Sequence, residues 1–437
     1  APAHVAHASA VAPRQSLCQG ATVVYSGRQF AVAEPLGAGS FGAVWRAVAE
    51  DGRSVAIKEI PCGSEAELAR VVAEGQVLKV VRQELTSAAA GSELLEHIPV
   101  LVAADVETVA SQFWRVRLVM TEVPGAQLEE VLNARRHAEK MRGALAPQQC
   151  GALLAQACCC AAELVGQLAP IVDAFSAKVC HRDITPRNIQ VTGLDAGRPT
   201  FGLVDFGLAV NAESWRAQGP GCDLGGDGRY WPASAWFTFG HGTRELARRP
   251  AMQHEYTRCL DIHSLGLSGL RCFVDMLPSL QVAEGELGDW EALDRLRDVQ
   301  AAWRRYWATA RGCWQPVFET FRSAGDYDAL RRRYAAEAVH EVVASDLRAL
   351  RRALVEGEAA LREVPESSGL AGVPALFRAF LSMLQCPCES AFTDAKCERM
   401  TRWSSESTVA SPTDASTLSP VSSCRSDFEG APRAGFP

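Results

Sequence analysis

The stretch that decides the fold is HRDITPRN, at residues 181–188, followed by DFG at residues 205–207. Asp183 can accept a hydrogen bond from a hydroxyl group and orient that group. Asn188, five residues later, can reach a metal ion from the other side of the same loop. Asp205 adds a carboxylate oxygen, which is the ligand type that Mg²⁺ prefers. Together these residues predict a loop that places a general base beside a metal ion.

A glycine-rich motif, LGAGSFGAV, lies near the N-terminal end at residues 36–44. Glycines at this spacing let a hairpin approach phosphates closely and present N–H groups to them. Dinucleotide-binding turns share the pattern, but they need a helix directly after the glycines. Residues 43–49 are typical of a strand instead, so the motif favours a hairpin over phosphates.

A lysine, Lys58, ends the apolar run VAIK at residues 55–58. A lysine at the end of a buried strand is costly unless it is paired. One interpretation is a surface lysine at a strand edge. The other is a cation that grips the α- and β-phosphates and is held by a carboxylate of the following helix. Glu74 is the first candidate for that carboxylate, and Glu67 is the alternative.

The four motifs occur in the order and rough spacing of eukaryotic protein kinases, and the chain resembles a divergent member of that family over about residues 29–384. The resemblance implies an α+β bilobal fold, with a β-rich N-terminal lobe at about residues 22–122 and a helical C-terminal lobe at about residues 124–390. It implies that ATP and Mg²⁺ bind between the lobes and that the γ-phosphoryl group passes to a protein substrate, at serine or threonine. The expected catalytic residues are Asp183, Lys58, Glu74, Asn188 and Asp205, of which Asn188 and Asp205 would hold the metal.

The resemblance also implies a pocket for the nucleotide. Met120 would be the gatekeeper, and the backbone of Thr121 and Val123 would bond the adenine edge. Val44 and Ala56 would form the roof. The full expected nucleotide-binding set is Leu36, Gly37, Gly39, Gly42, Val44, Ala56, Lys58, Met120, Thr121, Val123 and Gln190. Asp261, in the expected central helix, would cap the backbone of the catalytic loop.

Several positions depart from the family pattern. Thr185 stands where serine/threonine kinases usually carry a lysine that touches the γ-phosphate, and Arg187 stands where tyrosine kinases place an arginine. Gln190 occupies the adenine floor, where the family has an aliphatic residue, unless a shifted register brings Ile189 or Val191 there. These departures support a nucleotide-binding pseudokinase scaffold as the alternative function. A small-molecule kinase is a third hypothesis, against which the glycine-rich motif argues.

The segment after DFG is also altered. The family's Ala-Pro-Glu is replaced by Pro-Ala-Ser, which ends at Ser234, and its usual arginine partner by Ser390. Loss of either the glutamate or the arginine alone would leave one buried charge unpaired, which is costly, so the loss of both together is physically reasonable. We therefore expect Ser234 and Ser390 to lie near each other. Asp223 or Asp227 would pair with Arg182 in place of a phosphate.

The composition bounds the remaining expectations. The formal net charge of −7 over 437 residues argues against a general nucleic-acid binder. The 15 cysteines form no pair of CxxC motifs, so we expect no zinc site but reduced thiols, in an intracellular, cytoplasmic protein. No apolar run reaches about 18 residues, so no membrane span is expected. Residues 1–21 and 391–437 are expected to be disordered, and residues 22–390 to form the kinase domain. Within this domain we expect a five-stranded sheet in the N-terminal lobe and an expansion of the C-terminal lobe at 280–374.

Overall fold

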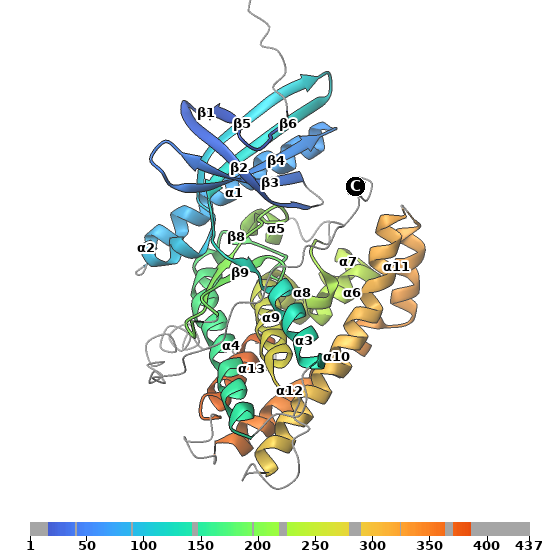
Figure 1. Cartoon of the computed structure of the whole chain (residues 1–437). Helices are drawn as coiled ribbons and strands as arrows, with labels where there is room; N and C mark the ends of the chain where they lie inside the picture. Colours follow the sequence, from blue (N-terminus) through green and yellow to red (C-terminus); the bar gives the residue numbers. More distant parts are fainter. Residues whose placement is uncertain are drawn as a thin grey trace, which may run out of the picture.

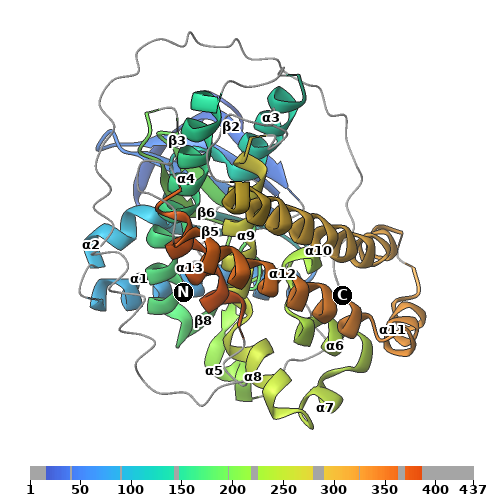
Figure 2. The same ribbon diagram turned by 90° about the horizontal axis from the view of Figure 1, so that it is seen from below.

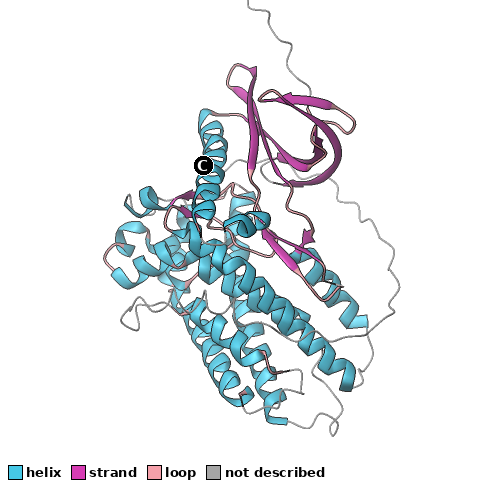
Figure 3. Cartoon of the chain, turned by 90° about the vertical axis from the view of Figure 1, so that its left-hand side faces the viewer, coloured by secondary structure: helices cyan, strands magenta, loops and turns pink. Residues whose placement is uncertain are grey.

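The computed structural model of the chain describes residues 16–385, with gaps at 40–41, 89–90, 142–146, 195, 218–224, 279–289, 324 and 363–369. Within these residues a β-rich part is followed by a helical part, and Figure 3 shows the strands gathered above the helices. This arrangement confirms the α+β bilobal fold that the sequence predicted.

Six antiparallel strands form the N-terminal sheet, in the order β1-β2-β3-β4-β6-β5 (Figure 1). Their β-branched and apolar residues suit a half-buried pleated surface. One long helix packs against the sheet, and its N-terminus is capped by Ser64, which accepts a bond from the amide of Glu67. The bounds are β1 Thr22–Tyr25, β2 Arg28–Gly39, β3 Gly42–Ala49, β4 Ser54–Cys62, β5 Leu101–Ala110, β6 Phe113–Thr121 and helix α1 Glu65–Ser87.

The prediction of five strands was wrong because β1 adds a sixth along the edge of β2. The segment before β1 also packs against the N-terminal lobe. Leu17 is 7% exposed, and its amide donates to Oε1 of Glu59 at 3.2 Å. The structure therefore places residues 16–21, although we expected all of residues 1–21 to be disordered. Residues 1–15 and 391–437 lie outside the described part of the chain.

Residues 16–21 and β1 together form what we call the N-terminal cover. A buried arginine, Arg117, lies beneath it and is 1% exposed. Its Nε donates to Oε2 of Glu59 at 2.8 Å, and a terminal nitrogen donates to Oε2 of Glu107 at 2.9 Å. The ring of Tyr25 in β1 lies 5.7 Å from its guanidinium carbon. The first strand thus closes a charged cluster that would otherwise face water.

The C-terminal lobe is built around α9, whose glycines allow close packing. A Cβ on Gly269 would lie 2.9 Å from Phe380 and 3.0 Å from Val165, so helices on both sides approach its backbone. Figure 2 shows α10, α12 and α13 lying side by side beneath this core. The helices are α3 Leu128–Met141, α4 Pro147–Ser176, α5 Ala212–Ala217, α6 Ala233–His241, α7 Thr243–Leu246, α8 Pro250–Arg258, α9 Leu260–Met276, α10 Trp290–Arg322, α11 Tyr327–Ala336, α12 Val339–Leu361 and α13 Val373–Leu384.

Short segments complete the two lobes. The expected expansion after residue 280 is formed by α10, α11 and α12. Between α11 and α12 the chain breaks at Ala338, whose φ of 47° is left-handed. The remaining elements are α2 Gly91–Leu94, β7 Ala126–Gln127, β8 Val179–Cys180, β9 Ile189–Thr192, β10 Thr200–Leu203 and β11 Val210–Asn211.

One helical segment of the described chain, Gly151–Ser176, is long and apolar enough to cross a membrane by length and composition alone. Half of its most apolar window is buried inside the protein, and a core helix passes the same test. Leu164 and Leu168 of this segment are fully buried. The absence of a membrane span therefore stays a prediction.

Candidate active site

Lys58 connects the two lobes through a pair of carboxylates. Its Nζ lies 2.8 Å from Oε1 of Glu74 in α1 and 2.8 Å from Oδ1 of Asp205. Burial alone would lower the pKa of Lys58, but the two carboxylates outweigh that effect and raise it, so the ammonium stays charged. Glu67, the alternative partner, instead accepts from the amide of Gly63 at the start of α1.

The catalytic loop is fixed by α9. The carboxylate of Asp261 accepts from the amides of His181 at 2.6 Å and Arg182 at 2.7 Å. The ring of His181 packs edge-on against Phe206, with centroids 4.6 Å apart. Arg182 and Asp205 have φ of 68° and 62°, values that side chains adopt only when the surroundings hold them there. The expected cap by Asp261 is therefore present.

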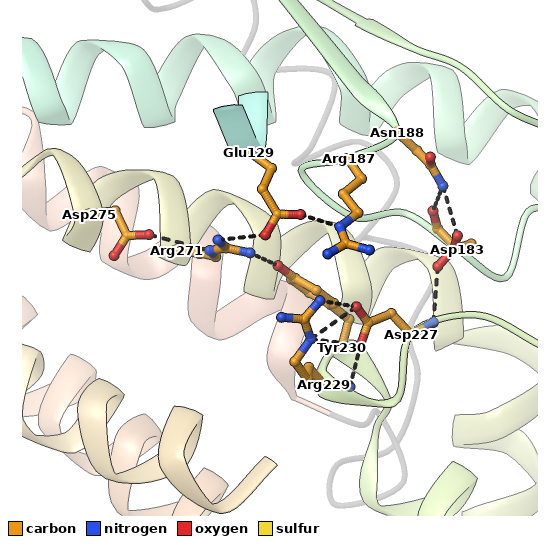
Figure 4. A network of polar contacts seen from close by, with 9 residues as sticks. All are labelled: Glu129, Asp183, Arg187, Asn188, Asp227, Arg229, Tyr230, Arg271 and Asp275. Atoms are coloured by element: carbon orange, nitrogen blue, oxygen red, sulfur yellow. Dashed lines mark hydrogen bonds and ion pairs between the residues drawn. The ribbon is translucent and has the colours of Figure 1, made fainter. Parts of the chain in front are cut away.

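Asp183 lies at the end of this loop, with its carboxylate held from two sides (Figure 4). Nδ2 of Asn188 donates to Oδ2 of Asp183 at 2.8 Å and to its carbonyl oxygen at 2.9 Å. The amide of Asp227 donates to Oδ1 at 3.0 Å. Burial, and after it the negative charge of Asp227, raise the pKa of Asp183 to about 7. A carboxylate with this pKa is suited to accept a proton near neutral pH.

The two expected metal ligands each keep one oxygen available. Asn188 uses its nitrogen to bond Asp183, and no described group donates to its Oδ1. Oδ1 of Asp205 accepts from Lys58 and from the amide of Gly207, whereas no described group donates to Oδ2. Burial alone would raise the pKa of Asp205, but the charge of Lys58 outweighs it and lowers the pKa. This donor set fits Mg²⁺.

The expected nucleotide pocket lies between β2, β3 and the segment after β6. Gly42 has φ of 134°, and a Cβ there would lie 2.1 Å from the carbonyl oxygen of Glu59, so only glycine fits. The amide of Thr121 donates to the carbonyl of Val100 at 2.9 Å, which fixes the end of β6. Met120 is 8% exposed, and its strand position opposite Ala56 suits the expected gatekeeper.

Gln190 lies in β9 between two buried residues. Ile189 is 0% exposed and Val191 is 5% exposed, and both join the core of the C-terminal lobe. Strand alternation puts Gln190, which is half-buried, on the opposite face. The shifted register considered from the sequence is therefore wrong. Of the remaining expected ligand contacts, Leu36 is 41% exposed, Val44 is half-buried, Gly37 pairs with Val44 across the hairpin, and Val123 packs beside Gly202.

A family model described as the protein kinase domain matches residues 30–285, which is more than half of the chain. The chain belongs to the protein kinase family. The crystal structure of the BubR1 kinase domain is similar at 14% identity and a TM-score of 0.42, with 86% of this chain and 91% of that chain covered. No curated protein matches the chain.

The activation segment of this kinase reaches the catalytic loop through Gly226 and Asp227. Gly226 has φ of 89°, and a Cβ there would lie 2.2 Å from the carbonyl oxygen of Arg182. The carboxylate of Asp227 pairs with Arg229, whereas Nε of Arg182 donates to the carbonyl of Leu208. We expected Asp227 to pair with Arg182, and the structure gives it another partner. The alternative, Asp223, lies outside the described residues.

Ser234 is fully buried, and its amide donates to Oε2 of Glu255 in α8 at 3.0 Å. A carboxylate thus approaches the end of the activation segment from another helix. Ser390 lies outside the described residues, so its predicted proximity to Ser234 stays a prediction.

A network of ion pairs that the sequence did not predict lies beside the catalytic loop (Figure 4). Oε1 of Glu129 accepts from Arg271 at 3.0 Å, and Oε2 pairs with Arg187 at 2.5 Å. Arg271 also donates to the hydroxyl of Tyr230 at 2.6 Å and pairs with Asp275 at 3.3 Å. One signal was available, because Arg271 interrupts an apolar helix and a buried arginine needs partners.

Proposed function

We propose that this kinase transfers the γ-phosphoryl group of ATP to a protein hydroxyl. One observation carries the proposal, namely that Lys58 contacts Glu74 and Asp205 at 2.8 Å each. This contact joins the N-terminal lobe, α1 and the expected metal ligand into one arrangement. Phosphoryl transfer needs placement and charge neutralisation more than covalent help, and an assembled site of this kind supplies both.

Each residue then has a role in the proposed reaction. Lys58 binds the α- and β-phosphates, and Asn188 and Asp205 hold Mg²⁺, which when bound neutralises negative charge on the phosphates. Asp183 accepts a hydrogen bond from the attacking hydroxyl and takes up its proton. The backbone of Thr121 and Val123 orients the adenine. Asn188 keeps the Asp183 carboxylate aimed, because it bonds both Oδ2 and the carbonyl.

A pseudokinase scaffold is the competing proposal, and Thr185 favours it. This residue is 3% exposed and carries no cation, so the charge that serine/threonine kinases usually place there is missing. The two proposals differ in turnover and not in nucleotide binding. Mg·ATP with a generic protein substrate should give phosphate incorporation, and Asp205→Ala should abolish it. The matched control is Asp51→Asn, a surface carboxylate far from the site. Nucleotide binding without incorporation by the wild-type protein would select the scaffold.

We expect serine or threonine as the acceptor, the targets most often modified by this family, and phosphoamino-acid analysis of the product tests this. We also propose an intracellular, cytoplasmic location. The support is that nine of the cysteines within the described residues are free thiols, as suits a reducing compartment.

A further inference from the structure

A large groove opens from the catalytic loop towards α10 and α11. Its volume is about 910 Å³, and Asp183, Thr185 and Asn188 form one end of it. A second groove of about 780 Å³ continues along α10 and shares Trp307 and Arg311 with the first. Because the two grooves share lining residues, they form one concave surface that reaches Asp183.

The lining of the first groove is unequal in charge. Among the described residues that line it, six are arginines and three are carboxylates, and one of the carboxylates is Asp183 itself. The arginines are Arg136, Arg187, Arg229, Arg271, Arg311 and Arg331. An excess of fixed positive charge in a concave site attracts anions.

The other two carboxylates are already engaged. Both oxygens of Glu129 take arginines of this chain, namely Arg271 and Arg187. The carboxylate of Asp227 accepts two bonds from Nε of Arg229, at 2.9 Å and 3.0 Å. Neither acid is left to receive a basic side chain of a substrate. The groove therefore disfavours peptides rich in lysine or arginine near the acceptor.

Two arginines of the far wall keep donors for a ligand. Nε of Arg331 in α11 donates to the carbonyl of Phe239, which holds the side chain while its terminal nitrogens stay available. Arg311 in α10 is exposed. Within the described residues neither pairs with a carboxylate. Guanidinium groups bind carboxylates and phosphates through paired hydrogen bonds, so these two suit an anionic side chain.

The same wall carries exposed aromatic surface. Phe318 is 41% exposed although it is large and apolar, and Trp314 lies against it with ring centroids 6.4 Å apart. Both line the groove. Exposed aromatic side chains beside arginines are typical anchors of protein recognition.

The geometry points to a substrate that carries an anionic side chain, glutamate, aspartate or a phosphorylated residue, near its acceptor hydroxyl and beside an apolar side chain. The anion binds Arg311 and Arg331, and the apolar side chain packs on Trp314 and Phe318. This inference rests on the proposed function for the identity of the bound peptide as a substrate.

Binding of labelled peptides tests the inference without requiring turnover. Four fluorescent peptides of one sequence, with a central serine flanked by Glu, Gln, Lys or phosphoserine, are titrated with the full chain and followed by anisotropy. The Glu or the phosphoserine peptide should bind about tenfold more tightly than the Lys peptide, because complementary charges discriminate partners. Preference for only one of the two identifies the source of the anion.

Charge reversal provides the matched comparison. Arg311→Glu with Arg331→Glu should remove or invert the preference, and Arg311→Gln with Arg331→Gln should abolish it. Arg348→Glu, an exposed arginine of α12 outside both grooves, should leave it unchanged. Equal binding of the Gln and anionic peptides, or a preference that survives both double variants, would overturn the inference. Failure of the proposed function would appear separately, as retained peptide preference with no phosphate incorporation.

Discussion

The amide of Asp227 donates a hydrogen bond to Oδ1 of Asp183 at 3.0 Å. The activation segment therefore touches the proposed base directly through its backbone. The carboxylate of Asp227 points elsewhere, to Arg229, yet its charge still raises the pKa of Asp183. One residue thus both positions and tunes the base.

The first prediction concerns the pH dependence of activity. The reaction needs ionised Asp183, so the rate should fall as pH drops through about 7. Asp227→Asn removes a neighbouring negative charge, which lowers the pKa of Asp183 and moves the acid limb to lower pH. The measurement is kcat/KM for a protein substrate across pH at saturating Mg·ATP. Asp51→Asn is the control, and an acid limb at the same pH in Asp227→Asn would refute the prediction.

The second prediction concerns stability of the nucleotide-free protein. The pKa of Asp183 is about 7 when folded, against a reference value of 3.8. Between these pH values the folded state binds the proton more tightly, so the contribution of Asp183 to stability falls as pH rises from about 4 to about 7 and is level above that. Asp183→Asn lacks this slope. In denaturant titrations the wild-type protein should lose unfolding free energy relative to Asp183→Asn as pH rises over that window; a difference that does not change with pH would count against the assigned pKa.

The third prediction concerns Gly226→Ala. The new Cβ would meet the carbonyl oxygen of Arg182, and the positive φ adds strain, so the activation segment must move off the catalytic loop. We expect phosphorylation to fall at least about tenfold, equivalent to about 1.4 kcal/mol. Gly197→Ala is the matched control, because its φ is also positive at 69° but nothing lies within 4 Å. It should cost only about 1 kcal/mol of stability, with activity retained.

The fourth prediction concerns the buried charge cluster of the N-terminal lobe. Arg117→Leu removes the cation that bonds Glu59 and Glu107, and it leaves buried carboxylates with less compensation. The free energy of unfolding should fall by about 3 kcal/mol or more, because breaking one side of a buried ion pair is expensive. Arg53→Ala breaks an exposed pair with Asp51 and should change little. Similar melting temperatures for the two variants would contradict this account.

The positions of the expected catalytic residues were predictable because their motifs are local. The HRD and DFG triplets each fix a short loop. Lys58 was expected at the end of a strand and lies in the middle of β4, which continues to Cys62. Glu74 was the first candidate for the partner of Lys58 and Glu67 the alternative, and the structure brings Glu74 to Lys58. The capping role of Glu67 also has a local signal, because this residue lies three positions after Ser64.

The remainder depended on contacts between distant segments. Glu129 and Arg271 are 142 residues apart, and the sequence around either residue does not predict its contact with the other. The same holds for Leu17 and Glu59. Their contact positions residues 16–21, although the composition of this segment is typical of disorder. The break at Ala338 was hidden because helical periodicity continues on both sides of it. Tertiary packing, not local preference, decides these features.

The N-terminal cover has a practical consequence for expression. A recombinant fragment trimmed to the family boundaries, residues 30–285, would begin after β1 and end before α10. At its N-terminal end the fragment would expose Arg117 and its acidic partners to solvent. At its C-terminal end it would lack α10, which carries Trp307. Such a fragment should aggregate or melt early, and an insoluble product would say nothing about the enzyme. Boundaries before Leu17 and after Leu384 preserve both ends of the folded unit.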